Sequence, residues 1–103
     1  MGEPQNYKDP NLAIIQRCKN GDRTAFQELY SLYAKAMFNI SLRILNDRNE
    51  AEEVLQDSFL KVFTKMDSYD KTYAFGAWLK CLVINGSLDV FNTRKVNFVS
   101  LDE

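Results

Sequence analysis

The sequence predicts an all-α fold, a compact bundle of about four helices, and two observations carry that prediction. The 103 residues include only 4 Gly and 2 Pro, which argues against a turn-rich β-sandwich and favours a few long helices. Apolar residues also recur at steps of three and four along several long stretches. A chain of this length forms one domain with a single core.

The first helix is bounded by residues that suit its two ends. Asp9 suits the N-cap position, and Pro10 suits the first helical position, where the missing N–H of proline costs nothing. The pattern predicts that this helix runs to about Lys19. Asn20-Gly21 then ends it, and Asp22 can cap the next helix.

The second helix is predicted to be the longest, from about Arg23 to Leu45. Its apolar residues form a continuous stripe made of Phe26, Leu29, Tyr30, Tyr33, Met37, Ile40 and Ile44. Further apolar residues widen this stripe and suit a helix contacted from two sides: Leu32, Phe38 and Leu45. An aromatic stripe of this kind indicates core packing rather than a ligand site.

The third helix has two candidate N-terminal caps and runs to about Met66. Asn49 with Glu52 resembles a capping box, and Asp47 with Glu50 is the competing choice. The residues predicted to face inward are Ala51, Val54, Leu55, Ser58, Phe59, Val62 and Met66. The opposite face presents Glu53, Gln56, Asp57 and Leu60, an acidic and amide group with one leucine.

A polar loop from Asp67 to Tyr73 separates the third helix from the fourth. The fourth helix is predicted from about Ala74 to about Arg94, and its packed start consists of Phe75, Trp78, Leu79 and Leu82. Gly86 weakens the middle of this helix by about 1 kcal/mol relative to alanine. Residues 96–103 form a short mixed tail.

Charge is divided along the chain although the formal net charge is −1. Residues 47–60 hold five carboxylates and one arginine, a net charge of −4. Residues 61–95 hold six basic side chains and three carboxylates, a net charge of +3. The first segment therefore suits a basic partner and the second suits phosphate, although two solvated helix faces would give the same pattern.

The sequence lacks the residues that several functional classes of protein need. The sequence has no His, so it offers no triad base and no imidazole metal ligand, and we expect neither an enzyme nor a cofactor. No apolar run approaches the roughly 18 residues of a membrane span, and residues 1–8 do not resemble a secretory signal. Cys18 and Cys81 lack metal-type spacing, and we expect reduced core thiols in a cytoplasmic protein rather than a disulfide.

Three groups of short sequence motifs follow one another along the chain. They are Gly21-Asp22, Ala25-Phe26, Leu29-Tyr30 and Tyr33; then Arg43-Ile44-Leu45, Ala51-Glu52-Glu53-Val54 and residues 56–63; then residues 75–79, Val83-Ile84-Asn85 and Asp89. Each of these motifs alone is common on helices. In this order and spacing, over about residues 11–95, they resemble region 2 of bacterial extracytoplasmic-function (ECF) sigma factors, which belong to the sigma-70 superfamily.

The resemblance implies a domain for transcription initiation that binds core RNA polymerase and recognises and melts the promoter −10 element. In relatives the third helix docks on the clamp helices of the polymerase β′ subunit, and the matching positions here are Glu53, Gln56, Asp57 and Leu60. The helical pattern already leaves these four residues on the outward face. Carboxylates and an amide suit the arginines of such a partner, and the leucine supplies an apolar anchor.

The resemblance also implies that single-stranded non-template DNA of the −10 element lies against the fourth helix and the loop before it. Tyr69, Lys71 and Tyr73 could form a pocket for an unpaired base, or the tyrosines could fold back on the core. Asn85 matches the position that contacts a base edge, because its amide offers both a donor and an acceptor.

Four more residues are assigned to DNA on the same grounds. Lys80, Arg94 and Lys95 would hold phosphates without reading sequence. Trp78 has two interpretations, a wedge at the melting point or a core side chain with a partly exposed edge, and we favour the second.

The sequence departs from the family pattern at the DNA face and at its C-terminal end. Ile84 stands where the family often has arginine, and residues 90–93 replace its usual basic run, so we expect weak DNA binding with a shallow salt dependence.

We assign residues 1–95 to region 2 and residues 96–103 to the start of an interdomain linker. Region 4, which reads the −35 element in the family, is expected to be absent. Relatives are commonly inhibited by an anti-sigma factor, so we expect such a partner as well.

The main alternative is a helical protein–protein adaptor module without DNA binding. It predicts no binding to a −10 oligonucleotide and no effect of Asn85→Ala. A protein that binds duplex DNA would need a basic recognition helix in a helix-turn-helix, and no pair of predicted helices has the short turn and basic face required.

Overall fold

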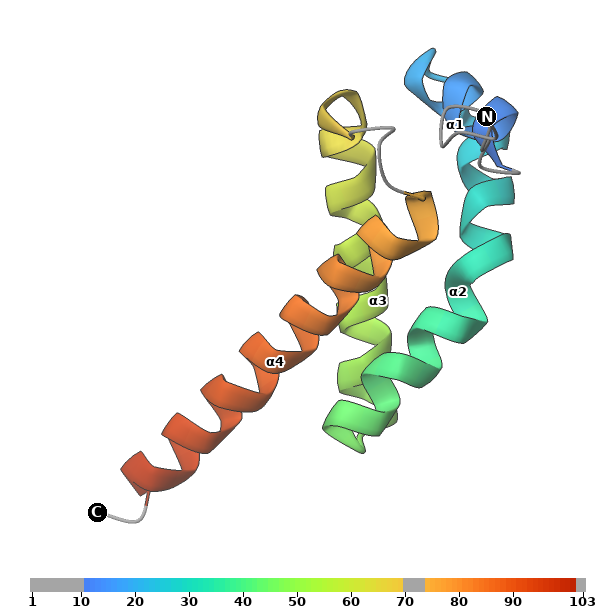
Figure 1. Ribbon diagram of the computed structural model, residues 1–103. Coiled ribbons are helices and arrows are strands. Elements are labelled where there is room, and N and C mark those ends of the chain that lie inside the picture. The colour runs from blue at the N-terminus through green and yellow to red at the C-terminus, as the bar shows by residue number, and fades with distance from the viewer. Residues whose placement is uncertain (1–10, 70–73, 102–103) are drawn as a thin grey trace, which may run out of the picture.

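The computed structural model describes residues 11–69 and 74–101, and over these ranges it consists of helices without a strand. The elements in order are α1 (Leu12–Lys19), α2 (Arg23–Leu45), α3 (Arg48–Lys65), the 3-10 helix η2 (Met66–Ser68) and α4 (Phe75–Leu101). α1 packs at the start of α2, α2 and α3 pack together, and α4 crosses both and extends beyond them (Figure 1). The predicted all-α bundle is confirmed.

The turn between α1 and α2 is made by the residues that the sequence assigned to it. Gly21 has a φ of +88°, a conformation that glycine adopts without steric cost. Asp22 caps α2, because its Oδ1 accepts hydrogen bonds from the N–H groups of Thr24 (2.9 Å) and Ala25 (3.2 Å). The bond from Ala25, followed by the ion pair with Arg17 (Nε–Oδ2 3.0 Å), holds the pKa of Asp22 below its usual range.

Two helix ends differ from the sequence prediction. α1 begins at Leu12, and the predicted cap Asp9-Pro10 lies outside the described residues. α4 continues to Leu101, whereas the prediction ended it near Arg94. No glycine or proline interrupts residues 95–101, so nothing in their local chemistry stops the helix there.

The connection between α2 and α3 contains two residues. Asn46 ends α2 in the left-handed conformation with a φ of 52°, which asparagine tolerates better than most side chains. Asp47 caps α3, and its Oδ1 accepts a hydrogen bond of 2.9 Å from the Glu50 N–H. Of the two capping pairs that the sequence allowed, Asp47 with Glu50 is therefore the one that forms.

The core lies where the three long helices meet. All seven residues that were predicted to face inward from the third helix are buried, and the last of them, Met66, lies in η2. They pack with residues from the other helices, among them Ile15, Leu29, Met37, Phe75, Leu79 and Val83. Two expectations were wrong. Leu32 is exposed rather than part of the α2 core stripe, and Cys81 is an exposed free thiol rather than a core residue, while Cys18 is free and half-buried.

Small residues allow α4 to approach its neighbours closely. A Cβ atom added at Gly86 would lie 3.3 Å from Val54 Cγ1, so the glycine permits close contact with α3. On the side toward α2, the buried hydroxyls of Ser41 and Ser87 lie 2.7 Å apart, and Ser87 Oγ is 2.8 Å from the Val83 carbonyl oxygen. The crossing therefore fixes which side of α4 faces outward.

Candidate functional site

The outward face of α3 carries the four residues that the sequence assigned to the polymerase. Glu53, Gln56, Asp57 and Leu60 are all exposed, in successive turns of one helix. Leu60 has 60% of its surface accessible, a large exposure for an apolar side chain. The face therefore combines two carboxylates and an amide with an apolar protrusion.

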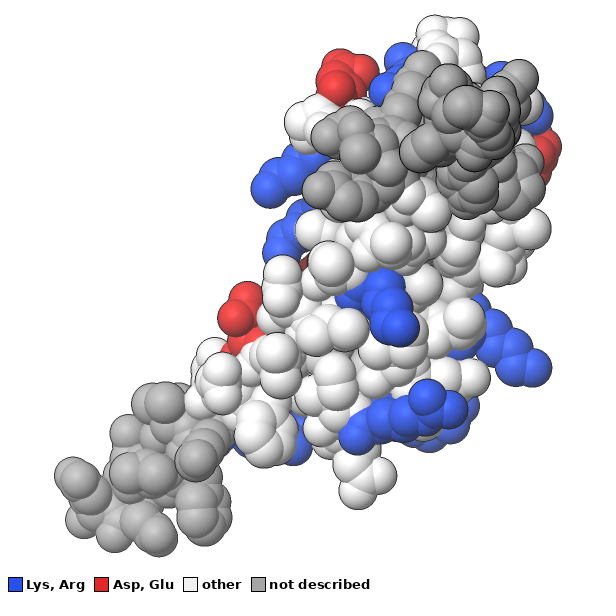
Figure 2. Space-filling model, in the orientation of Figure 1, with Lys and Arg blue, Asp and Glu red and all other residues white. Residues whose placement is uncertain are grey.

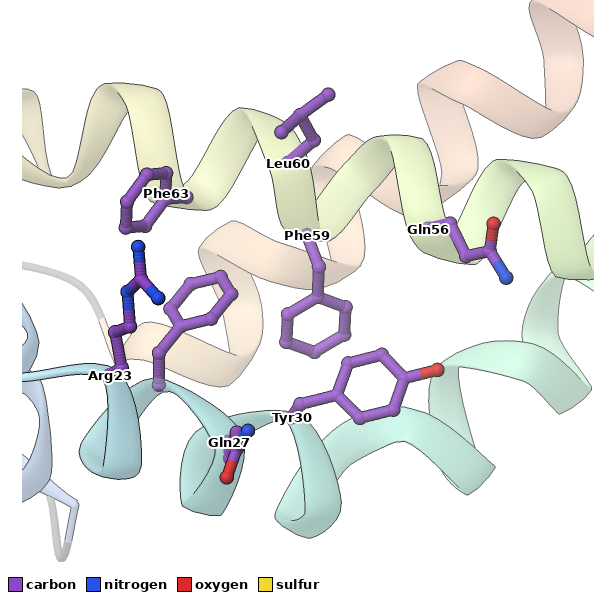
Figure 3. Close-up of a pocket in the computed structure, with 8 residues that line it drawn as sticks. Arg23, Gln27, Tyr30, Gln56, Phe59, Leu60 and Phe63 are labelled. Carbon is purple, nitrogen blue, oxygen red and sulfur yellow. The ribbon is translucent and has the colours of Figure 1, made fainter.

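An apolar groove of about 480 Å³ lies beside this face, between α2 and α3. Its walls come from Arg23, Phe26, Gln27 and Tyr30 on α2 and from Gln56, Phe59, Leu60 and Phe63 on α3. In Figure 3 the Arg23 side chain extends toward Phe63, and the Leu60 side chain points away from α2. The aromatic rings pack edge to face, with centroids 5.1 Å apart for Phe26 and Phe63 and 4.8 Å apart for Tyr30 and Phe59.

Phe63 is a surface residue that the sequence prediction did not single out. It has 54% of its surface accessible and lies at the end of the groove. The signal was present in its spacing, because residues 53, 56, 60 and 63 continue one helix face. The apolar part of the α3 surface is consequently larger than the single leucine that was predicted.

A second groove, of about 380 Å³, lies between α3 and α4. Its lining includes Asp57, Leu60 and Lys61 from α3 and Asp89 and Val90 from α4. Leu60 borders both grooves and so lies on the ridge that separates them.

Tyr69 does not form an open base pocket. Only 5% of its surface is accessible, and its ring stacks on Trp78 with centroids 5.1 Å apart and an interplanar angle of 30°. Tyr69 also packs edge to face against Phe75. This arrangement matches the alternative in which the tyrosine folds back on the core. Trp78 is half-buried, while Lys71 and Tyr73 lie outside the described residues.

The remaining residues assigned to DNA lie along α4. Lys80 and Asn85 are exposed. Figure 2 shows the face on which α4 lies in front, where Lys and Arg side chains are scattered over a largely uncharged surface with few Asp or Glu. Arg94 is also exposed, but its guanidinium is bonded within the protein, and the side chain of Lys95 lies outside the described residues.

Two further properties hold for residues 11–69 and 74–101. No cluster of three or more acidic, cysteine or histidine side chains is placed to bind a metal ion. None of the helices in this part of the chain combines the length and apolar character needed to cross a membrane.

Comparison with known proteins identifies the class to which this helical bundle belongs. Residues 29–96 match the Sigma-70 region 2 family. The match covers more than half of the chain, and the chain belongs to this family, whose members are parts of transcription initiation factors. The resemblance to region 2 that the sequence motifs indicated is thereby confirmed.

The similar proteins include ECF sigma factors. The ECF RNA polymerase sigma factor SigW of Bacillus subtilis is 27% identical over 84 residues, which are 82% of this chain and 45% of that protein. The ECF RNA polymerase sigma-E factor of Haemophilus influenzae is 32% identical over 73 residues, which are 71% of this chain and 38% of that protein. This chain therefore spans less than half the length of either relative.

A solved structure has the same fold. It is an NMR structure of an engineered region 2 of sigmaE in complex with GTAAAA, and it superposes with a TM-score of 0.76 at 22% sequence identity. The superposition covers 82% of this chain and 88% of that chain.

Proposed function

We propose that this domain binds core RNA polymerase through α3 and holds the promoter −10 element as single-stranded non-template DNA against α4. The observation that carries the proposal is the surface of α3, where Leu60 and Phe63 are exposed next to acidic and amide side chains. In this proposal the domain contributes binding energy to promoter opening and is not an enzyme.

The α3 surface has the chemistry of a docking site for a basic, partly apolar helix. Leu60 and Phe63 each expose more than half of their surface beside a groove that is lined largely by aromatic rings. Glu53 and Asp57 offer carboxylates to arginines of the partner, and Gln56 adds a donor and an acceptor. The clamp helices of the β′ subunit, which the family resemblance implies, are a partner of this kind.

The surface of α4 supports the DNA part of the proposal. Asn85 is exposed and carries an amide that can pair with a base edge, and Lys80 is exposed on the same helix and can hold a phosphate. The stacking of Tyr69 on Trp78 holds the start of α4 in place. The complex of sigmaE region 2 with GTAAAA supports the same class of ligand for this domain.

The polymerase interface is tested by pull-down of purified β′ clamp helices with this domain. The Gln56→Ala, Asp57→Ala double variant should weaken binding by tenfold or more, since residues at the centre of an interface contribute about 1–3 kcal/mol each. The matched control is Glu28→Ala with Asn39→Ala, which removes one carboxylate and one amide from exposed positions of α2. Undiminished binding by the first double variant would reject the interface assignment.

The DNA interface is tested by fluorescence anisotropy with a single-stranded −10 oligonucleotide. Asn85→Ala should weaken binding about tenfold, because a good amide–base contact contributes about 1–3 kcal/mol. Asn39→Ala serves as the control for loss of an exposed amide. If the wild-type domain does not bind the oligonucleotide, the DNA assignment fails and the adaptor function takes its place.

One observation favours the adaptor as the second candidate. Leu88 and Phe91 of α4 have 44% and 41% of their surfaces accessible, so part of this helix presents apolar groups where phosphate contacts would need cations. The oligonucleotide experiment separates the two functions directly.

Two further parts of the proposal follow from the family resemblance. An anti-sigma factor that covers the α3 and α4 surfaces is expected as an inhibitor, and the domain is expected to act in the cytoplasm. Competition between a co-purified inhibitor and the β′ clamp helices would test the first expectation, and simultaneous binding of both would contradict it.

A further inference from the structure

Arg94 lies at the point where three helices meet. Its guanidinium is bonded to other residues of the protein, whereas an arginine that binds phosphate would present this group to the solvent. Its Nη2 donates a hydrogen bond of 3.1 Å to the carbonyl oxygen of Leu45, the last residue of α2. The same nitrogen pairs with the carboxylate of Glu50 in the first turn of α3. One turn earlier on α4, the ring of Phe91 lies 5.9 Å from the guanidinium carbon. We call these four residues the Arg94 junction.

Each contact in the junction has a physical reason. The carbonyl of Leu45 belongs to the last turn of α2, where such groups lack a partner within the helix and carry the negative end of the dipole. Glu50 lies at the positive end of the α3 dipole, so the carboxylate is favourably placed before the arginine reaches it. The ring of Phe91 adds a cation–π contact that restricts the guanidinium. The two N–H groups of Nη2 can serve the carbonyl and the carboxylate, while the planar guanidinium lies over the Phe91 ring, and a lysine ammonium lacks that planar face.

The junction lies beyond the buried part of α4. The Ser41–Ser87 hydrogen bond holds the middle of that helix against α2, and Arg94 holds it again two turns later. Asn85 is close to the first attachment and on the same helix as the second. The direction in which α4 presents Asn85 therefore depends on both attachments.

We propose that Arg94 is a positioning residue, which sets the orientation of the DNA-binding helix α4 against the start of the polymerase-binding helix α3, rather than a phosphate ligand. This inference rests on the proposed DNA function of α4. It departs from the prediction from the sequence, which grouped Arg94 with the phosphate contacts. It also links the two proposed interfaces, since Glu50 is a residue of the helix that carries Gln56 and Asp57.

The test is a double-mutant cycle on affinity for the single-stranded −10 oligonucleotide, measured at a temperature where circular dichroism shows every variant to be folded. Arg94→Ala and Glu50→Gln should each weaken binding about threefold to tenfold, and the double variant should be no weaker than the single variants. Lys35→Ala and Glu52→Gln are the controls, because each removes the same charge from an exposed position outside the junction.

A phosphate contact predicts different results in the same experiment. Glu50→Gln would then strengthen binding by releasing the arginine, and Arg94→Lys would retain most of the affinity. Arg94→Ala would also reduce the slope of log K against log salt by about 0.7, the value for one phosphate of a single strand. A positioning residue leaves that slope unchanged, and Arg94→Lys stays close to Arg94→Ala.

Three outcomes overturn the inference, and they are distinct from one another. Tighter oligonucleotide binding by Glu50→Gln, or a reduced slope of log K against log salt for Arg94→Ala, assigns Arg94 to phosphate. Unchanged affinity in both single variants, with a lowered midpoint of thermal unfolding, leaves Arg94 a purely structural role. Absence of oligonucleotide binding by the wild-type domain overturns the proposed DNA function together with this inference.

Discussion

Because α4 crosses close to α3 at Gly86, we expect an unusual effect of Gly86→Ala on the free energy of unfolding. Replacing a glycine within a helix by alanine ordinarily stabilises the helix by about 1 kcal/mol. At this position the added methyl group would lie 3.3 Å from Val54 Cγ1 and 3.9 Å from Ser58 Oγ. Because carbon atoms pack best at about 3.5–4.0 Å, Val54 would have to move by a few tenths of an ångström.

The size of the net effect follows from these two opposing contributions. Val54 is buried in the core, so moving it resembles mild overpacking, whose cost starts at about 1 kcal/mol. Since overpacking typically costs about 1–3 kcal/mol, Gly86→Ala should leave the free energy of unfolding unchanged or lower it by up to about 2 kcal/mol. In a Val54→Ala background the close contact is gone, and the same substitution should now stabilise the protein by about 1 kcal/mol.

Urea denaturation followed by circular dichroism measures all four members of this cycle. Gly21→Ala provides the control for the same chemical change, and it should be destabilising by about 1–2 kcal/mol, because the positive φ at that turn is strained for an L side chain. If Gly86→Ala stabilised the wild type and the Val54→Ala variant equally, the close approach of α4 to α3 at this position would be refuted.

Three other predictions concern stability and reactivity. Ser87→Ala should lower the free energy of unfolding by about 1–3 kcal/mol, because the buried Ser41 hydroxyl loses its partner. Ser41→Ala should cost less, since Ser87 keeps its contact with a backbone carbonyl; denaturation of both variants checks the order, and equal losses would contradict it. The pKa of Asp22 is lower in the folded chain than in the unfolded chain, so its stabilising contribution is complete above about pH 4 and is lost as the pH falls through the lowered pKa. Asp22→Asn should remove that part of the acid dependence of Tm, and an unchanged acid profile would argue against the cap. Thiol titration should label Cys81 before Cys18, because burial raises the pKa of the Cys18 thiol and shields it; simultaneous labelling would contradict this burial.

The faces of α3 could be predicted from the sequence because the helical period alone decides them. A residue such as Phe59 belongs to the buried set and Gln56 to the exposed set wherever the partner helices lie. The cap at Asp22 was predictable for the same reason, since a cap acts on N–H groups two and three residues away.

The parts of the site that sequence could not decide depend on contacts between distant segments. Tyr69 had two equally reasonable positions, and the proximity of Trp78 and Phe75 selects the buried one. Arg94 was grouped with the phosphate contacts from its charge and the family resemblance, because the sequence does not show its partners. Its partner Glu50 is 44 residues away, and only the fold brings them together. Leu32 fits the helical stripe by spacing, but within residues 11–69 and 74–101 no helix covers that side of α2 well enough to bury it.

The two-residue connection between α2 and α3 has a consequence for the order of folding. Closing so short a loop costs little chain entropy, whereas α4 must return across a longer segment before it can dock. We expect the α2–α3 hairpin to form in the transition state and α4 to join it later, so that the acidic surface of α3 exists before α4, the helix that we propose to bind DNA, is in place. Kinetic φ-values should then be higher for Leu55→Ala than for Leu79→Ala, and the reverse order would show that folding begins at α4.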